Sequence, residues 1–102
     1  MSSPKRTVIL SPTAQADFTD ILLTTWQQWR EAQSNRYEAA LSEAIVSLAE
    51  FPEAGAHRPR LFLGCRVRPV ERHVVYYRIN DDTIEVIRIL HERADPTRHL
   101  PQ

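Results

Sequence analysis

The sequence predicts an α+β fold in which a pair of helices packs on an antiparallel β-sheet. Residues 64–70, 73–79 and 84–91 are rich in β-branched and aromatic residues, and short polar breaks separate the three runs. This pattern is typical of two consecutive hairpins, and so of three antiparallel strands. Two stretches with helical periodicity precede the strands. When a helical hairpin covers one face of the sheet, the apolar sides of the helices and of the sheet are buried against each other.

The N-terminal third is expected to hold a short strand followed by a helix. Residues 7–10 form an apolar strand candidate, and Ser11 with the proline after it is a favourable helix start. Asp17 and Asp20 fall on the polar side near this start, where the helix dipole favours carboxylates. The helix is predicted to run to about Arg30 on an apolar stripe made of Ala14, Phe18, Ile21, Leu22, Thr25 and Trp29.

A second helix is predicted from Ser34, which is a good N-cap, to the break at residues 51–55. Proline disfavours helix in the residue before it, and glycine permits the turn. The short link between the helices implies that they are antiparallel. The apolar stripe of the second helix is Tyr37, Leu41, Ala44, Ile45 and Leu48. Near the C-terminus, Asp95 is expected to cap one further helical turn.

Symmetric closure of both hairpins predicts which strand residues share a face, because cross-strand partners point the same way. The expected pairs are Arg66 with Tyr77, Arg68 with Val75, Val75 with Arg88, and Tyr77 with Val86. One face is then basic and aromatic: Arg66, Arg68, His73, Val75, Tyr77, Val86 and Arg88. The other face is apolar: Val67, Pro69, Val74, Tyr76, Ile87 and Ile89. We expect the helices to bury the apolar face and the basic aromatic face to be the working surface.

Length and charge limit the possible classes of protein. The 102 residues suffice for one domain, and the net charge of +0 argues against a generally basic nucleic-acid binder. The charge is divided unevenly: residues 1–54 hold four Lys+Arg against seven Asp+Glu, and residues 55–102 hold nine against six. Lys5 is the single lysine. An excess of arginine fits a recognition surface for phosphate or carboxylate, although codon usage explains it equally well.

Cys65 is the single cysteine, so the sequence excludes an internal disulfide and a cysteine-based zinc cluster. A lone thiol most often packs as a small apolar group, and we expect Cys65 to be buried. The apolar run at residues 7–10 is too short for a signal-peptide core or a membrane span. We therefore expect a cytoplasmic protein that needs no cofactor and no metal.

Three motifs together resemble a known family. They are Leu-Ser-Pro-x-Ala-x-x-Asp-Phe-x-x-Ile at residues 10–21, Phe-Pro-x-x-Gly-x-x-Arg at 51–58, and His-Val-Val-Tyr-Tyr-Arg at 73–78 followed by Ile-Glu-Val-Ile-Arg-Ile-Leu-His-x-x-x-Asp at 84–95. In this order and spacing they are similar to the ParE branch of the RelE/ParE toxin superfamily, from about residue 7 to residue 98. The resemblance implies the α+β fold described above and the toxin half of a type II toxin–antitoxin module.

The resemblance also implies partners. Such toxins form hetero-oligomeric complexes with a small antitoxin, often ParD-like, and operator DNA is bound only through the antitoxin. ParE toxins act on DNA gyrase, whereas RelE-type relatives cut mRNA on the ribosome. No membrane association is implied. An inactive relative that serves only as antitoxin partner and co-repressor is a third possibility.

The residues allow two modes of action to be compared: cleavage of RNA by a ribonuclease, and inhibition of a target by protein–protein contact. A metal-independent ribonuclease needs a base, an acid and cations in one pocket. Here His91 would have to join Arg66, Arg68 and Arg88, but the lysine cluster on the second-helix side and the tyrosine after the last strand, which the resemblance to RelE-type enzymes would imply, are missing. The sequence therefore favours action by protein–protein contact, with no catalytic residue. Ion pairing within the domain explains each arginine about as well as a functional role does.

Candidate contact residues lie on both layers. Arg66, Arg68, Tyr77 and Arg88 belong to the predicted working face of the sheet, and the double substitution Arg66→Ala, Arg68→Ala is expected to weaken toxicity or antitoxin binding without unfolding the domain. Leu23 and Trp26 fall off the core stripe of the first helix. Large apolar side chains exposed in this way often lie at interfaces, so these two are expected to bind the antitoxin.

Overall fold

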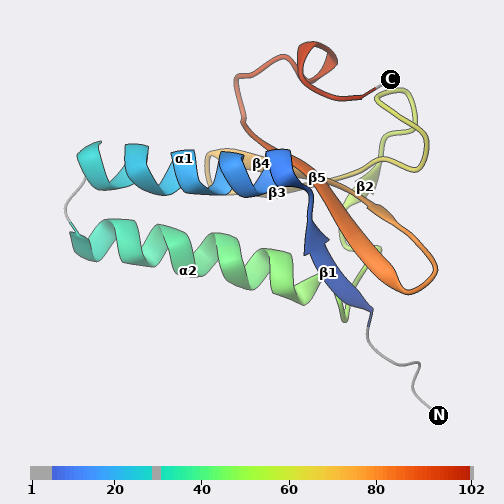
Figure 1. Cartoon of the computed structure of the whole chain (residues 1–102), viewed down its shortest axis with the longest axis horizontal. Helices are drawn as coiled ribbons and strands as arrows, with labels where there is room; N and C mark the ends of the chain where they lie inside the picture. Colours follow the sequence, from blue (N-terminus) through green and yellow to red (C-terminus); the bar gives the residue numbers. More distant parts are fainter. Residues whose placement is uncertain (1–5, 29–30, 102) are drawn as a thin grey trace.

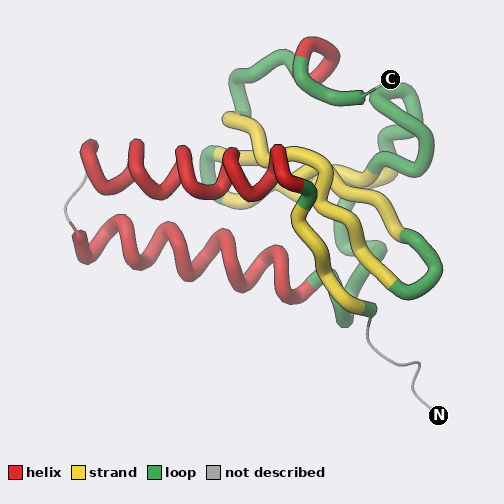
Figure 2. Tube along the Cα trace, in the orientation of Figure 1, coloured by secondary structure: helices red, strands yellow, loops and turns green. Residues whose placement is uncertain are grey.

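The fold has a helical layer and a sheet layer, as predicted. The computed structural model describes residues 6–28 and 31–101. Its elements are β1 (Thr7–Leu10), α1 (Pro12–Gln28), α2 (Glu31–Ser47), β2 (Ala56–His57), β3 (Arg66–Val70), β4 (His73–Ile79), β5 (Thr83–His91) and the 3₁₀ turn η1 (Pro96–Arg98). The strands form one five-stranded sheet in the order β1-β5-β4-β3-β2. The two helices run antiparallel on the same side of this sheet (Figure 1, Figure 2).

Local sequence signals explain where the first helix and the C-terminal turn begin. The Ser11 hydroxyl accepts a hydrogen bond from the Ala14 N–H at 3.0 Å and so caps α1, as predicted. The Asp95 carboxylate accepts the Thr97 N–H at 3.0 Å and caps η1, also as predicted. Among the described residues, no helix is both long and apolar enough to cross a membrane.

The predicted start of the second helix was wrong. Ser34 lies inside α2 rather than at its N-cap, and its side chain is buried. The helix starts earlier because the residues before Ser34 (Glu-Ala-Gln) are good helix formers, and nothing in them interrupts the helix. The predicted end of the first helix at Arg30, and Trp29 of its apolar stripe, lie outside the described residues.

The sheet has two strands beyond the predicted antiparallel three. β1 pairs in parallel with β5, so the N-terminal strand forms one edge of the sheet. β2, which the sequence did not indicate, pairs with β3 and forms the other edge. A two-residue strand leaves no periodic pattern that a sequence could reveal. The β1–β5 pairing also joins residues far apart along the chain, such as Thr7 and Thr83.

The predicted assignment of the two sheet faces was inverted. The helices cover the face that carries Val75, Tyr77 and Val86, all of which have no exposed surface. The opposite face carries Val67, Val74 and Tyr76, and it packs against Phe62 and Leu100. Both faces are therefore buried, and alternation along a strand does not distinguish which of two buried faces receives the helices. The face that was expected to be the working surface instead packs against the helices and forms the sheet side of the main core.

An irregularity in β5 changes the predicted register. The pairs Arg66–Tyr77, Arg68–Val75 and Tyr77–Val86 are as expected. Between Tyr76 and Tyr77 the ladder shifts by one residue, so Val75 pairs with Ile89 instead of Arg88. This β-bulge moves Ile89 into the helix-side core, although it was predicted on the other face. A bulge of this kind breaks strict alternation, which was the basis of the prediction.

The second core lies on the side of the sheet away from the helices. It holds Phe62, Cys65, Tyr76, Leu90 and Leu100, contributed by the loop before β3, by the sheet and by the C-terminal segment. Figure 2 shows this loop and the C-terminal segment on the same side of the molecule. Cys65 is fully buried, as predicted, and burial raises the pKa of its thiol to about 11. Cys65 is therefore a packing residue with little thiolate character.

Candidate functional site

Arg88, a predicted contact residue, is half of an ion pair inside the domain. Its Nε and Nη2 atoms donate to the two carboxylate oxygens of Asp17, each at 2.8 Å. One of these oxygens also accepts the Ile89 backbone N–H at 3.0 Å. The pair raises the pKa of Arg88, chiefly through the hydrogen bond to Asp17. Asp17 was predicted on the exposed polar side of the helix, but it ties α1 to β5 instead.

The other predicted sheet contacts lie under the helical layer. The Tyr77 side chain is fully buried, and its hydroxyl donates to the Pro52 carbonyl at 2.7 Å and accepts the Gly55 N–H at 2.9 Å. Tyr77 therefore cannot stack on a partner, contrary to the prediction. Arg66 donates to the Gly55 carbonyl at 2.9 Å, and both Arg66 and Arg68 are half-buried. Arg66 therefore bonds within the domain, and whether the double substitution leaves the domain folded stays a prediction.

The register separates the residues that the ribonuclease alternative would require. His91 pairs with His73, and His73 pairs with Val70 at the last position of β3. Arg66 starts the same strand, four residues away, which corresponds to about 13 Å along the strand. Arg88 is engaged by Asp17. The structure therefore does not bring His91 together with Arg66 and Arg88 into one pocket.

Leu23 and Trp26 are exposed on α1, as expected. Their exposed fractions are 57% and 62%, and they lie on the side of the helix away from the buried Ile21 and Thr25. Val46 on α2 is also largely exposed, at 67%. Whether Leu23 and Trp26 bind a partner stays a prediction.

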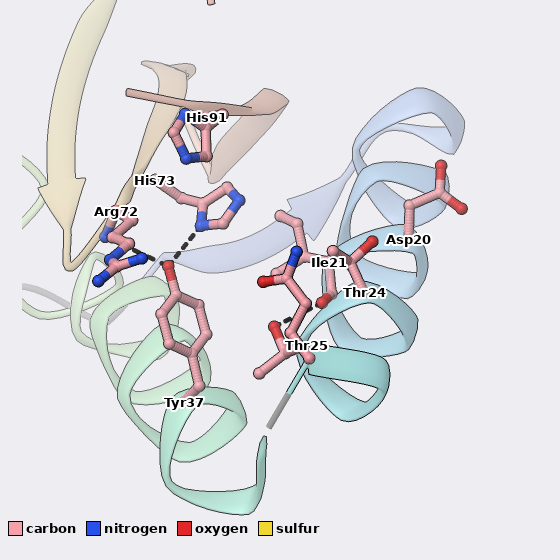
Figure 3. Close-up of a pocket in the computed structure, with 9 residues that line it drawn as sticks. Asp20, Ile21, Thr24, Thr25, Tyr37, Arg72, His73 and His91 are labelled. Atoms are coloured by element: carbon pink, nitrogen blue, oxygen red, sulfur yellow. Dashed lines mark hydrogen bonds between the residues drawn. The ribbon is translucent and has the colours of Figure 1, made fainter. Parts of the chain in front are cut away.

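A pocket of about 220 Å³ lies between the helical hairpin and the end of the β4–β5 ladder. Figure 3 shows that α1, α2 and the two strands each contribute side chains to it. Tyr37 of α2 and the histidine pair form one wall, and polar side chains of α1 form the other. Its lining residues are Asp20, Ile21, Thr24, Thr25, Gln28, Tyr37, Arg72, His73 and His91.

Tyr37, His73 and His91 form a connected cluster in this pocket. The Tyr37 hydroxyl hydrogen-bonds Nδ1 of His73 and accepts the Arg72 backbone N–H at 3.3 Å. The rings of His73 and His91 meet edge to face, with centroids 5.3 Å apart. Nδ1 of His91 accepts the Arg93 backbone N–H at 3.1 Å. The cluster joins α2 to the turn before β4 and to the end of β5.

Burial shifts the acid–base properties of the cluster. The pKa of His73 is lowered, mainly because burial disfavours the charged ring and also because His91 is adjacent, while Glu92 opposes this in part. The pKa of Tyr37 is raised, mainly by burial. His73 and Tyr37 are therefore both uncharged at neutral pH.

We expect the stability of the domain to fall as the pH drops below about 6.5, the ordinary pKa of histidine. The folded state holds the pKa of His73 below its unfolded value, so the unfolded chain binds more protons in acid. The stability that the neutral His73 ring contributes is fully present above the pKa that His73 has in the unfolded chain. Urea titrations of wild type and His73→Gln between pH 5.5 and 7.5 give the free energy of unfolding of each protein as a function of pH. The contribution of His73 is the difference between the slopes of these two pH dependences. His57→Gln is the control, since His57 is exposed on β2. Equal pH slopes for wild type and His73→Gln would contradict the expectation.

The sequence indicated part of this cluster. It suggested His91 as a candidate and placed His73 on the same face as the arginines, but the prediction did not extend to the direct pairing of the two histidines. The predicted register would place His73 opposite Leu90, and the β-bulge in β5 brings His91 there instead. Tyr37 was predicted only as a core residue, and its contact with His73 joins residues 36 positions apart. Among the residues that the structure describes, no three His, Cys, Asp or Glu side chains gather as a metal site.

Comparison with known proteins places these features in context. The family model for the ParE toxin of type II toxin–antitoxin systems (parDE) matches residues 8–96. Toxin ParE1 of Mycobacterium tuberculosis is 34% identical over 93 residues, which cover 90% of this chain and 95% of that protein. Toxin ParE1 of Caulobacter vibrioides is 35% identical over 91 residues, covering 89% and 94%. Toxin ParE of Escherichia coli is 35% identical over 89 residues, covering 85% of each chain.

Two solved structures share the fold. A chain from the chromosomal ParDE system of P. aeruginosa matches with a TM-score of 0.74 at 20% identity, covering 87% of this chain and 98% of that one. A chain from the toxin–antitoxin complex RelBE2 of Mycobacterium tuberculosis matches with a TM-score of 0.62 at 23% identity, covering 85% and 98%. At these identities the two likenesses establish the α+β architecture and nothing further.

Proposed function

Since this chain belongs to the ParE family of type II toxin–antitoxin toxins, we propose that it inhibits DNA gyrase by protein–protein contact and is neutralised by a ParD-like antitoxin. The observation that carries the proposal is the family match, which spans residues 8–96. In this mechanism the toxin binds the enzyme and changes its balance of DNA cleavage and religation. It performs no covalent chemistry of its own.

The placement of the charged residues supports action by contact. A ribonuclease without a metal needs its acid, base and cations within hydrogen-bond reach of one phosphate. Arg88 is held by Asp17, and Arg66 is bonded to the Gly55 carbonyl beneath the helical layer. The likeness to a RelBE2 chain keeps an mRNA endonuclease as the alternative to be tested.

One experiment distinguishes the two targets. Purified toxin is added to gyrase with supercoiled plasmid, and separately to programmed ribosomes with mRNA. We expect linear DNA to accumulate with gyrase while the mRNA stays intact. Codon-positioned mRNA cleavage with unaffected gyrase would overturn the proposal. If induction without the antitoxin permits normal growth and neither target responds, the chain is an inactive relative that serves only as antitoxin partner.

We propose further that Leu23 and Trp26 are contact residues for the antitoxin. The two side chains are three positions apart on α1, so they form one exposed apolar strip. A central tryptophan in an interface often contributes about 2 kcal/mol or more. The double substitution Leu23→Ala, Trp26→Ala is therefore expected to weaken antitoxin binding about 30-fold or more, as measured by titration calorimetry.

Leu63→Ala is the matched control for this experiment. Leu63 is 90% exposed in the loop before β3, far along the chain from α1. The control is expected to leave antitoxin affinity unchanged within about threefold. If the α1 double variant and the control bind equally well, the antitoxin does not use the α1 strip.

A further inference from the structure

The pocket formed by Tyr37, His73 and His91 has a hydrogen-bonding pattern that defines its ligand. The Arg93 N–H points at Nδ1 of His91, so Nδ1 must be unprotonated and the neutral ring carries its proton on Nε2. The Tyr37 oxygen already accepts the Arg72 N–H. In the tautomer in which the Tyr37 hydroxyl donates to Nδ1 of His73, the neutral His73 ring carries its proton on Nε2 as well. In that tautomer both imidazoles offer an N–H donor.

Figure 3 shows where these donors lie. The His73 nitrogen that does not contact Tyr37 faces the α1 side of the pocket, and the His91 ring lies above the His73 ring in this view, offset away from α1. Arg72 also lines the pocket, but its guanidinium lies on the other side of the Tyr37 hydroxyl from His73 (Figure 3). The α1 wall adds Thr24 and Gln28, each of which can donate. The sheet side of the pocket is therefore a set of hydrogen-bond donors.

We propose that this pocket binds one carboxylate group, held by His73 and His91. The cavity of about 220 Å³ suits a small acid or the end of one acidic side chain. The carboxylate comes either from a free organic acid or from a glutamate or aspartate of a protein partner. This site stands independently of the gyrase target.

The charges around the imidazoles favour a singly charged ligand over a phosphate dianion. Asp20 is the carboxylate that lines the pocket; it is exposed and points away from the two rings (Figure 3). The flanking carboxylates are also exposed, so water screens their repulsion of a bound anion. A second negative charge on the ligand would still increase this repulsion. The titratable and charged groups that surround the rings are Asp20 of α1, Tyr37 of α2, Glu71 and Arg72 of the turn, and His91, Glu92 and Arg93 at the end of β5.

Binding should couple to protonation of the rings. In the free protein burial lowers the pKa of His73. A carboxylate against the ring favours the imidazolium, so it raises the pKa of the histidines that it contacts. The protein holds two further histidines, His57 and His99, which are exposed and do not line the pocket. They are internal controls within the same molecule.

NMR of the histidine ring protons tests the proposal on the full chain. The four resonances are followed against pH with and without sodium acetate, at constant ionic strength. We expect saturable shifts at His73 and His91 and midpoints raised by roughly one pH unit, with His57 and His99 unchanged. A capped glutamate tripeptide and its glutamine counterpart identify the source. Tighter binding of the glutamate peptide than of acetate supports a protein side chain, and equal binding supports a free acid.

The variant His91→Gln gives a second test, since the exposed His91 ring can be replaced at little risk to the core. It is expected to weaken acetate binding at least tenfold, read at the His73 resonance. His99→Gln is the matched control and is expected to bind as the wild type does. The absence of saturable shifts at His73 and His91, equal shifts at all four histidines, or unchanged binding by His91→Gln would each overturn the proposal.

Discussion

Replacing Asp17 with asparagine is expected to destabilise the domain by about 3 kcal/mol, because it breaks a largely buried ion pair and leaves the Arg88 charge uncompensated. The Asp17 carboxylate accepts two hydrogen bonds from the Arg88 guanidinium and one from the Ile89 N–H. The side chains are 13% and 21% exposed, so water replaces little of what is lost. For a domain of this size such a loss lowers Tm by roughly 15 °C. Thermal and urea unfolding of the purified variant measure both quantities.

Asp20→Asn is the matched control for this substitution. Asp20 lies on the same helix, three residues further on, and is exposed. Its replacement should change the free energy of unfolding by less than about 0.5 kcal/mol. A loss below about 1 kcal/mol for Asp17→Asn would show that the pair contributes little.

The double variant Asp17→Leu, Arg88→Met separates the two possible origins of the effect. An apolar pair of similar volume has no charge to leave unpaired, and it can match the ion pair in stability. If the double variant is nearly as stable as wild type, the cost of Asp17→Asn comes from the uncompensated arginine. If the double variant is as unstable as the single one, losing the acceptor for the Ile89 N–H, which asparagine keeps and leucine removes, costs about as much as the uncompensated arginine.

The sequence predicted the helices and strands better than it predicted which face of the sheet the helices cover. Ser11 and Asp95 cap their helical turns, and the Arg66–Tyr77 pair has the expected register, because caps and hairpins are set by neighbours in sequence. The face that receives the helices depends on what covers the other face. Here Phe62 and Leu100 cover it, from segments with no regular periodicity.

For the candidate site, too, the sequence did not predict contacts between residues that are distant along the chain. Arginine residues on strands suggested an exposed cationic surface, since a charged side chain is seldom placed in a core. The structure gives two of them partners inside the domain instead: Asp17 pairs with Arg88, and a backbone carbonyl bonds Arg66, whereas the buried Nε of Arg68 has no hydrogen-bond partner among the described residues. These partners are 71 and 11 residues away in sequence. Single-sequence patterns carry no information on such contacts, so the Tyr37–His73 contact was missed for the same reason.

Replacing Gly55 with alanine is expected to destabilise the domain by about 3 kcal/mol, because there is no space for a Cβ atom. That atom would lie 2.7 Å from the Tyr77 hydroxyl oxygen and 2.7 Å from the Val67 carbonyl oxygen. The Tyr77 ring is fully buried, and its hydroxyl is bonded to the Pro52 carbonyl and the Gly55 N–H. Relief therefore requires a backbone shift that costs about 1–3 kcal/mol and breaks hydrogen bonds worth about 1 kcal/mol each.

Gly64→Ala is the control that separates crowding from backbone strain. Gly64 has φ of +77°, and a Cβ atom there would approach only the Arg78 Cβ, at 3.9 Å. Its cost should be the left-handed backbone penalty of about 1 kcal/mol. Urea unfolding should therefore rank wild type above Gly64→Ala, and Gly64→Ala above Gly55→Ala. If the hydroxyl is the main obstacle, adding Tyr77→Phe to Gly55→Ala will destabilise less than the sum of the two single substitutions. Full additivity would mean that the Tyr77 ring, whose Cε1 lies 2.8 Å from the added Cβ, or the Val67 carbonyl is the main obstacle. A Gly55→Ala variant no less stable than Gly64→Ala would mean that the loop after α2 moves freely away from the sheet.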